Sequence, residues 1–137
     1  MTGLLVDTGF LIALFRPAER NRPQARAFLL SNRLPLVTVA PVIVETCFFL
    51  DPEQKQSLLE WVQRGAIGVT DLPVSIYPEL SAIIGKYADL NIDFADAALV
   101  WLAGETGVKT VLTLDEKDFG IYRLKGGKRF EVVRWFE

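Results

Sequence analysis

The sequence contains no histidine and a single cysteine, Cys47. Without histidine the chain cannot form a Ser-His-Asp or Cys-His triad, use imidazole as a general acid or base, or build most kinds of zinc site. A lone cysteine cannot form an internal disulfide, and we expect Cys47 to be a small buried core residue beside Phe48 and Phe49. Any chemistry must therefore come from carboxylates and hydroxyls.

Long apolar runs are also absent. Each apolar stretch is broken well before the roughly 18 residues that a membrane span needs, and the opening lacks the basic region and cleavage site of a signal peptide. These absences predict a cytoplasmic protein with no membrane partner. Hydrophobic residues make up 50% of the chain and charged residues 23%, which is typical of one globular domain over residues 1–137.

Short apolar segments alternate with helical patterns along the chain, which predicts parallel strands joined by right-handed helical crossovers. The expected fold is an α/β three-layer α/β/α sandwich with a central parallel sheet of about five strands. The residues after 114 are expected to form a loop. Strands are predicted at residues 4–6, 36–39, 67–69, 109–114 and 130–135, and helices at 8–15, 20–32, from Pro41 onward, at 53–64, 75–89 and 94–105.

Four acidic residues stand in or at the end of apolar segments: Asp7, Glu45, Asp96 and Asp115. Burying an unpaired carboxylate is costly, so several that converge normally share a bound cation or line a wet cleft. Two carboxylates about 4 Å apart repel by about 4 kcal/mol at an effective dielectric constant of 20. All-oxygen ligation selects Mg²⁺ or Mn²⁺. The pattern predicts a divalent-metal site at the carboxyl edge of the sheet.

Neighbouring residues leave alternatives open. Asp7 suits the N-cap of the following helix as well as a ligand, and Thr8 either caps that helix or holds a water at the metal. Asp93 is explained as a helix cap, whereas Asp96 stands among alanines that give it room. Asp115 and Asp118 both follow the predicted strand 109–114, and we expect Asp115 to lie nearer the metal while Asp118 caps or braces the loop.

These residues resemble the PIN-domain ribonucleases, in particular the VapC-like toxins of toxin–antitoxin pairs. The resemblance rests on Leu5-Val6-Asp7-Thr8, on Val44-Glu45, on Asp93-Phe94-Ala95-Asp96-Ala97-Ala98-Leu99 and on Leu112 to Phe119, in the family's order and spacing. It implies a cleft of three or four acids that binds Mg²⁺ or Mn²⁺ and hydrolyses RNA. Asp7, Glu45 and Asp96 match the first three family acids, and either Asp115 or Asp118 matches the fourth.

The same resemblance implies a homodimer bound by an antitoxin whose Arg or Lys enters the acidic cleft. A stand-alone PIN nuclease of RNA processing and a non-catalytic PIN-like RNA-binding module remain alternatives. A phosphatase of the haloacid-dehalogenase type requires a second Asp where this chain has Gly9, and no glycine-rich nucleotide loop follows Asp7.

An acidic cleft alone repels RNA, so basic groups must help to bind phosphate. Phe10, Phe119 and Tyr122 are expected near the cleft, where core packing competes with stacking on bases. The candidate basic groups are Arg16, Arg20, Arg22 and Arg26 near one end of the chain, and Arg123, Lys125, Lys128 and Arg129 near the other.

Overall fold

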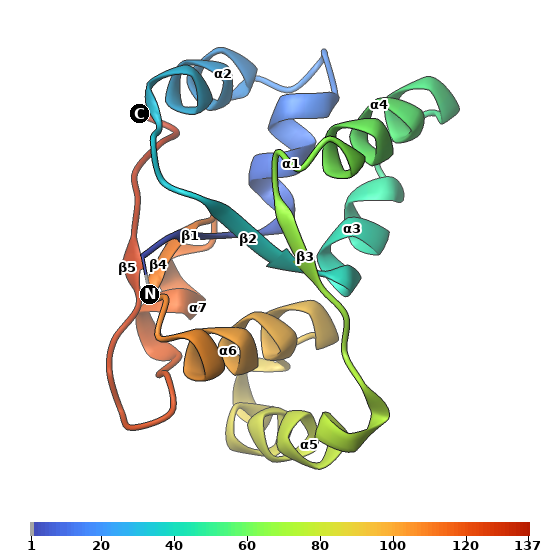
Figure 1. Ribbon diagram of the computed structural model, residues 1–137. Coiled ribbons are helices and arrows are strands. Elements are labelled where there is room, and N and C mark those ends of the chain that lie inside the picture. Colours follow the sequence, from blue (N-terminus) through green and yellow to red (C-terminus); the bar gives the residue numbers. More distant parts are fainter. Residues whose placement is uncertain (1) are drawn as a thin grey trace.

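The computed structural model describes residues 2–137, in which a five-stranded sheet lies between two layers of helices (Figure 1). The strand order is β3-β2-β1-β4-β5, and all neighbouring strands are parallel. Helices α1 to α4 cover one face, and α5 and α6 cover the other. The predicted α/β/α sandwich is therefore confirmed. The strands are β1 (Leu4–Val6), β2 (Leu36–Val39), β3 (Gly68–Thr70), β4 (Thr110–Leu112) and β5 (Glu131–Val132).

Prolines and side-chain caps set where the helices begin. Proline stands in the first turn of α2, α3, α4 and α5, where an N–H group is not needed. Asp51 and Gln54 form a reciprocal capping box at the start of α4. Gly107 ends α6 in the left-handed region, with φ 76°. The helices are α1 (Thr8–Phe15), α2 (Arg22–Ser31), α3 (Ala40–Cys47), α4 (Pro52–Gln63), α5 (Tyr77–Lys86), α6 (Phe94–Thr106) and α7 (Glu116–Ile121), with short 3₁₀ turns η1 (Val74–Ile76) and η2 (Ala88–Leu90).

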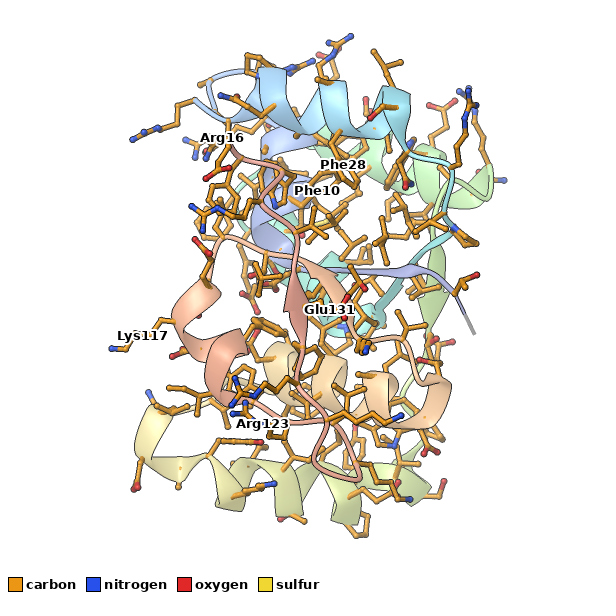
Figure 2. All side chains as sticks on the ribbon, turned by 90° about the vertical axis from the view of Figure 1, so that its left-hand side faces the viewer. Phe10, Arg16, Phe28, Lys117, Arg123 and Glu131 are labelled. Carbon is orange, nitrogen blue, oxygen red and sulfur yellow. The ribbon has the colours of Figure 1, made fainter. Side chains whose placement is uncertain are left out.

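The central strand β1 is fully buried and is anchored on both sides of the sheet. The buried Thr38 of β2 donates its hydroxyl hydrogen bond to the carbonyl oxygen of Val6 at 2.6 Å. Phe10 of α1 packs edge-on against Phe28 and Trp135, at ring-centroid distances of 6.0 and 4.9 Å, and Figure 2 shows Phe10 and Phe28 together beneath α2. This packing fixes the point at which the chain leaves β1.

The segment after β4 is a helix rather than the predicted loop. Strand β4 ends at Leu112 instead of residue 114, and α7 begins at Glu116. Asp115 caps α7 by accepting a hydrogen bond from the Asp118 N–H at 3.1 Å, and Phe119 anchors the helix in the core. One cap and one buried aromatic are enough to hold a helix of six residues against β5.

Two further expectations were wrong in detail. The predicted helix 75–89 is divided into η1, α5 and η2. Ile76 leaves the helical conformation before α5, and Tyr87, whose ring is buried, leaves it after α5. The predicted strand 130–135 is reduced to two residues, although Phe130 and Trp135 on either side of it are buried. The apolar pattern of these segments correctly predicted that they contain buried residues, but it did not predict where the helix and the strand begin and end.

Cys47 is half-buried rather than part of the closed core. It lies at the end of α3, and the following Phe48 is 78% exposed. This stretch therefore forms surface, contrary to our expectation. No helix within residues 2–137 is long and apolar enough to cross a membrane.

Candidate active site

Asp7 is the first residue after β1 and is held by two hydrogen bonds. Its Oδ1 accepts from the Thr8 N–H at 2.8 Å, and its Oδ2 accepts from the Thr113 hydroxyl at 2.6 Å. Burial raises the pKa of Asp7, opposed by these two bonds and reinforced by repulsion from Asp93 and Asp115. Asp7 is therefore the N-cap of α1 and also a candidate site residue. It is one of five acids whose charges act on one another, called the acidic group: Asp7, Glu45, Asp93, Asp96 and Asp115.

Thr113 is a site residue that the sequence analysis missed. Residues Val6 and Leu112 are paired in the β1–β4 ladder, so the next residues along each strand, Asp7 and Thr113, stand side by side at the sheet edge. The Thr113 hydroxyl donates to Asp7 and accepts from the Asp115 N–H at 3.0 Å. Thr113 thereby links the ends of β1 and β4. Aligning the two strand ends in the sequence would have placed Thr113 beside Asp7.

Asp93 and Asp96 begin α6 at the same edge. Asp93 is the predicted helix cap, with its Oδ1 accepting from the Asp96 N–H at 2.8 Å. Burial, followed by repulsion from Asp7 and Asp93, raises the pKa of Asp96 to about 8. The buried Tyr122 donates its hydroxyl hydrogen bond to Asp96 Oδ2 at 3.0 Å, and burial together with the charge of Asp96 raises the pKa of this phenol. Nothing in the local sequence predicts this pairing.

Glu45 and Thr8 approach the group from α3 and α1. Glu45 is half-buried, and burial followed by repulsion from Asp93 and Asp7 raises its pKa, while the nearby Thr8 hydroxyl opposes the shift. The buried Oγ1 of Thr8 nevertheless makes no hydrogen bond of good geometry within residues 2–137. Asp7, and not Thr8, caps α1. The Thr8 hydroxyl is therefore a buried polar group beside the Glu45 carboxylate.

Asp115 and Asp118 are separated by the first turn of α7. Repulsion from Asp115 is among the main causes of the raised pKa of both Asp7 and Asp96, and repulsion from Asp118 is not among them. Partial burial and repulsion from Asp115 raise the pKa of Asp118 itself. The bracing roles are reversed relative to expectation, because Asp115 supplies the capping carboxylate and Asp118 the N–H. Of the pair, Asp115 is the residue whose charge is among the causes of the raised pKa values of Asp7 and Asp96.

The group as it stands is a set of mutually repelling carboxylates. Within residues 2–137, no three Asp, Glu or Cys side chains are arranged closely enough to ligate one ion without rearrangement. The donor set nevertheless fits a hard cation, because every donor is oxygen and one buried hydroxyl lacks a partner. A divalent cation would offset the repulsion that raises the pKa values of Asp7, Glu45 and Asp96.

A cleft of about 700 Å³ adjoins the acidic group, with Glu45 and Asp93 in its lining. Its other walls are largely apolar and exposed: Phe48 is 78% exposed and Phe94 42%. The cleft therefore joins carboxylates to an apolar surface.

The basic and aromatic candidates have different surroundings. The Arg123 guanidinium donates hydrogen bonds to three carbonyl oxygens at the end of α7, so it holds that turn. Arg16 pairs with Glu19 at 3.3 Å. Phe10, Phe119 and Tyr122 are buried in the core and are not available for stacking on bases. The remaining candidates are exposed or half-buried on α2 and its preceding turn (Arg20, Arg22, Arg26) and in the turn before β5 (Lys125, Lys128, Arg129).

The chain is similar in sequence and in fold to known proteins. Ribonuclease VapC26 of Mycobacterium tuberculosis is 29% identical over 134 residues, which cover 95% of this chain and 99% of the relative. The crystal structure of M. tuberculosis VapC20, a sarcin-ricin loop cleaving toxin, superimposes with a TM-score of 0.72 at 15% identity, covering 84% of this chain and 92% of that one. The model of the PIN domain matches residues 4–125. The chain belongs to the PIN domain family.

Proposed function

We propose that this protein is a Mg²⁺- or Mn²⁺-dependent endoribonuclease that hydrolyses RNA phosphodiester bonds and serves as the toxin of a toxin–antitoxin pair. The observation that carries the proposal is the grouping of Asp7, Glu45 and Asp96 at one sheet edge, where the pKa of each is raised by burial and by the neighbouring carboxylates. Similarity to a ribonuclease and to a toxin of known structure supports the same activity.

We assign Asp7, Asp96, Glu45 and Asp115 to the cation, directly or through water. Hydrogen bonds orient both carboxylate oxygens of Asp7 and one of Asp96, so rotation of both carboxylates is restricted. Asp118 lies one helical turn from Asp115 and is assigned a supporting role. When bound, the cation supplies positive charge that activates a water and stabilises the charge developing on the scissile phosphate.

The residues of the chain contribute the remaining steps. The buried Thr8 hydroxyl lies beside the Glu45 carboxylate and is assigned to orienting that carboxylate. The Glu45 carboxylate, assigned to the cation through water, is suited to accept a proton from the attacking water. The exposed basic side chains of α2 and of the turn before β5 are assigned to RNA phosphates. Lys117, which Figure 2 shows projecting from α7, is a further candidate close to Asp118.

Cleavage is tested by incubating the purified protein with a panel of structured RNAs in Mg²⁺, Mn²⁺ or EDTA. We expect cleavage with either metal and none in EDTA. Asp7→Asn should abolish cleavage while the protein stays folded, and Asp89→Asn, at an exposed position in η2, is the matched control that should remain active. Cleavage that persists in EDTA, or an active Asp7→Asn variant, contradicts the proposed mechanism.

The apolar cleft supports an antitoxin as partner. An antitoxin segment that carries apolar side chains and one Arg or Lys would cover the exposed Phe48 and Phe94 and place its cation beside Glu45 and Asp93. Occupation of this cleft would compete with metal binding.

Growth measurements test the toxin role. Expression of the wild-type protein alone should arrest growth, co-expression with the product of an adjacent small gene should restore it, and Asp7→Asn should be harmless. Harmless expression of a protein that cleaves RNA in vitro would instead favour the stand-alone nuclease of RNA processing. Binding of RNA without cleavage would favour the non-catalytic module.

A further inference from the structure

Tyr122 is the only aromatic side chain among the described residues that donates a hydrogen bond to a carboxylate of the acidic group. Its ring is completely buried, and its hydroxyl lies 3.0 Å from Asp96 Oδ2. No other hydrogen bond to the Asp96 carboxylate is formed within residues 2–137. One oxygen of Asp96 is thus occupied by a neutral donor, and the other is free to meet a cation.

The position of the Tyr122 ring is set by the fold and not by Asp96. The ring packs edge-on between Tyr87 and Phe119, at centroid distances of 5.0 and 5.1 Å. Its own N–H donates to the Asp118 carbonyl oxygen at 2.9 Å, and its carbonyl oxygen accepts from the Arg123 guanidinium at 2.9 Å. These contacts hold the backbone and the ring of Tyr122 independently of its hydrogen bond to Asp96.

Tyr87 holds Arg123, the residue that follows Tyr122. Its hydroxyl accepts a hydrogen bond from the Arg123 N–H at 2.8 Å, which fixes the turn that follows Tyr122. Tyr87 and Tyr122 are thus neighbours in one aromatic group, each with one hydroxyl hydrogen bond, but only Tyr122 meets a carboxylate of the site. This difference makes Tyr87 a natural control.

We propose that Tyr122 is a positioning residue, whose hydroxyl orients the Asp96 carboxylate for divalent-metal binding. Tyr122 follows the C-terminal end of α7, whereas Asp115 precedes its N-terminal end. The inference rests on the proposed function, since it takes Asp96 to be a ligand. Helix α7 then serves the site at both ends: the charge of its N-cap Asp115 acts on Asp7 and Asp96, and its C-cap Tyr122 acts through a hydrogen bond to Asp96. Partners that orient metal ligands commonly contribute roughly 10-fold to 100-fold to metal affinity.

Calorimetric titration of Mn²⁺ into the wild-type protein, Tyr122→Phe and Tyr87→Phe tests this role. Both substitutions keep the ring and remove one hydroxyl. We expect Tyr122→Phe to bind Mn²⁺ roughly 10-fold to 100-fold more weakly and Tyr87→Phe to bind within about 2-fold of wild type. Thermal unfolding in EDTA reports the structural effect of each substitution without metal. RNA cleavage by Tyr122→Phe should recover as Mn²⁺ is raised to saturation, because only the arrangement of a ligand has been weakened.

Several outcomes would overturn the inference. Unchanged or tighter Mn²⁺ binding by Tyr122→Phe excludes a positioning role. Equal weakening by both substitutions assigns the effect to packing, and loss of cooperative unfolding in Tyr122→Phe assigns it to folding. A wild-type protein that binds no Mn²⁺ removes both the inference and the proposed metal site. A wild-type protein that binds Mn²⁺ but cleaves no RNA removes the proposed function alone, and the comparison of the two variants still decides the role of Tyr122.

Discussion

Replacing Asp96 with Asn should stabilise the metal-free protein, and the gain should grow with pH. Burial and the charges of Asp7 and Asp93 raise the pKa of Asp96 from 3.8 to about 8. A carboxyl group whose pKa is raised by folding holds its proton more tightly in the folded state, so stability is lost as pH rises from the unfolded pKa to the folded one. The affected window therefore runs from about pH 4 to pH 8. At about 1.4 kcal/mol for each pKa unit, the upper bound above pH 8 is about 6 kcal/mol.

The substitution should recover part of this free energy. The Asn amide oxygen can still accept the Tyr122 hydrogen bond, and Asn has nearly the same volume as Asp, so no cavity is created. The half-buried Asp7 still experiences repulsion from Asp93 and Asp115 after Asp96 is replaced, so part of the electrostatic cost remains. We expect a gain of about 3 kcal/mol in the free energy of unfolding at pH 8 and less than about 0.5 kcal/mol at pH 4.

Urea denaturation in EDTA, followed from pH 4 to pH 8.5, measures the gain through the midpoint and slope of each transition. The control is Asp89→Asn, which makes the same chemical change at an exposed position and should alter stability by no more than about 0.5 kcal/mol at any pH. Saturating Mn²⁺ should stabilise the wild-type protein and have little effect on Asp96→Asn. A gain that is absent at pH 8, or equal at pH 4 and pH 8, would refute the reasoning.

Three further predictions concern the residues around the site and the assembly. Asp115→Asn should reduce Mn²⁺ affinity more than Asp118→Asn, because the charge of Asp115 is among the main causes of the raised Asp7 pKa and that of Asp118 is not. A calorimetric titration with the larger loss in Asp118→Asn would reverse this order. Thr113→Val removes the hydrogen bond to Asp7 and leaves the Asp115 N–H without its acceptor, so the free energy of unfolding should fall by roughly 1–3 kcal/mol, as measured by urea denaturation. Light scattering of the purified protein should give the mass of a homodimer, and a monomer would contradict that expectation.

The sequence predicted the sheet well because its strands carry an unambiguous signal. The apolar residues of β1, β2 and β4 lie between helical segments, and Asp7 follows β1 directly. Both the strand and its carboxyl end can therefore be predicted from the sequence. Asp93 was predicted as a cap for the same reason, since a capping residue and its helix are adjacent. The sequence could therefore predict the features that depend only on residues close together in the chain.

The contacts that were missed join residues far apart in the chain. Asp7 and Thr113 are separated by 106 positions, and Asp96 and Tyr122 by 26. Tyr122 was considered as a possible base-stacking residue, with core packing as the alternative, but its hydroxyl partner is decided only when α6 and α7 pack together. Helix α7 was missed because a segment of six residues has too few positions to display a helical period.

The central place of β1 has a consequence for the timing of synthesis. The ribosome produces Asp7 early, but Thr113, which holds one of its oxygens, and Tyr122, which holds Asp96, emerge only when most of the chain has been made. Strand β1 also lacks one of its two neighbours until β4 arrives. A growing or prematurely terminated chain that stops just before β4 therefore contains Asp7, Glu45 and Asp96 but lacks Thr113 and Tyr122, which hold two of these acids. The carboxyl edge of the sheet is therefore completed only late in synthesis, when β4 takes its place beside β1.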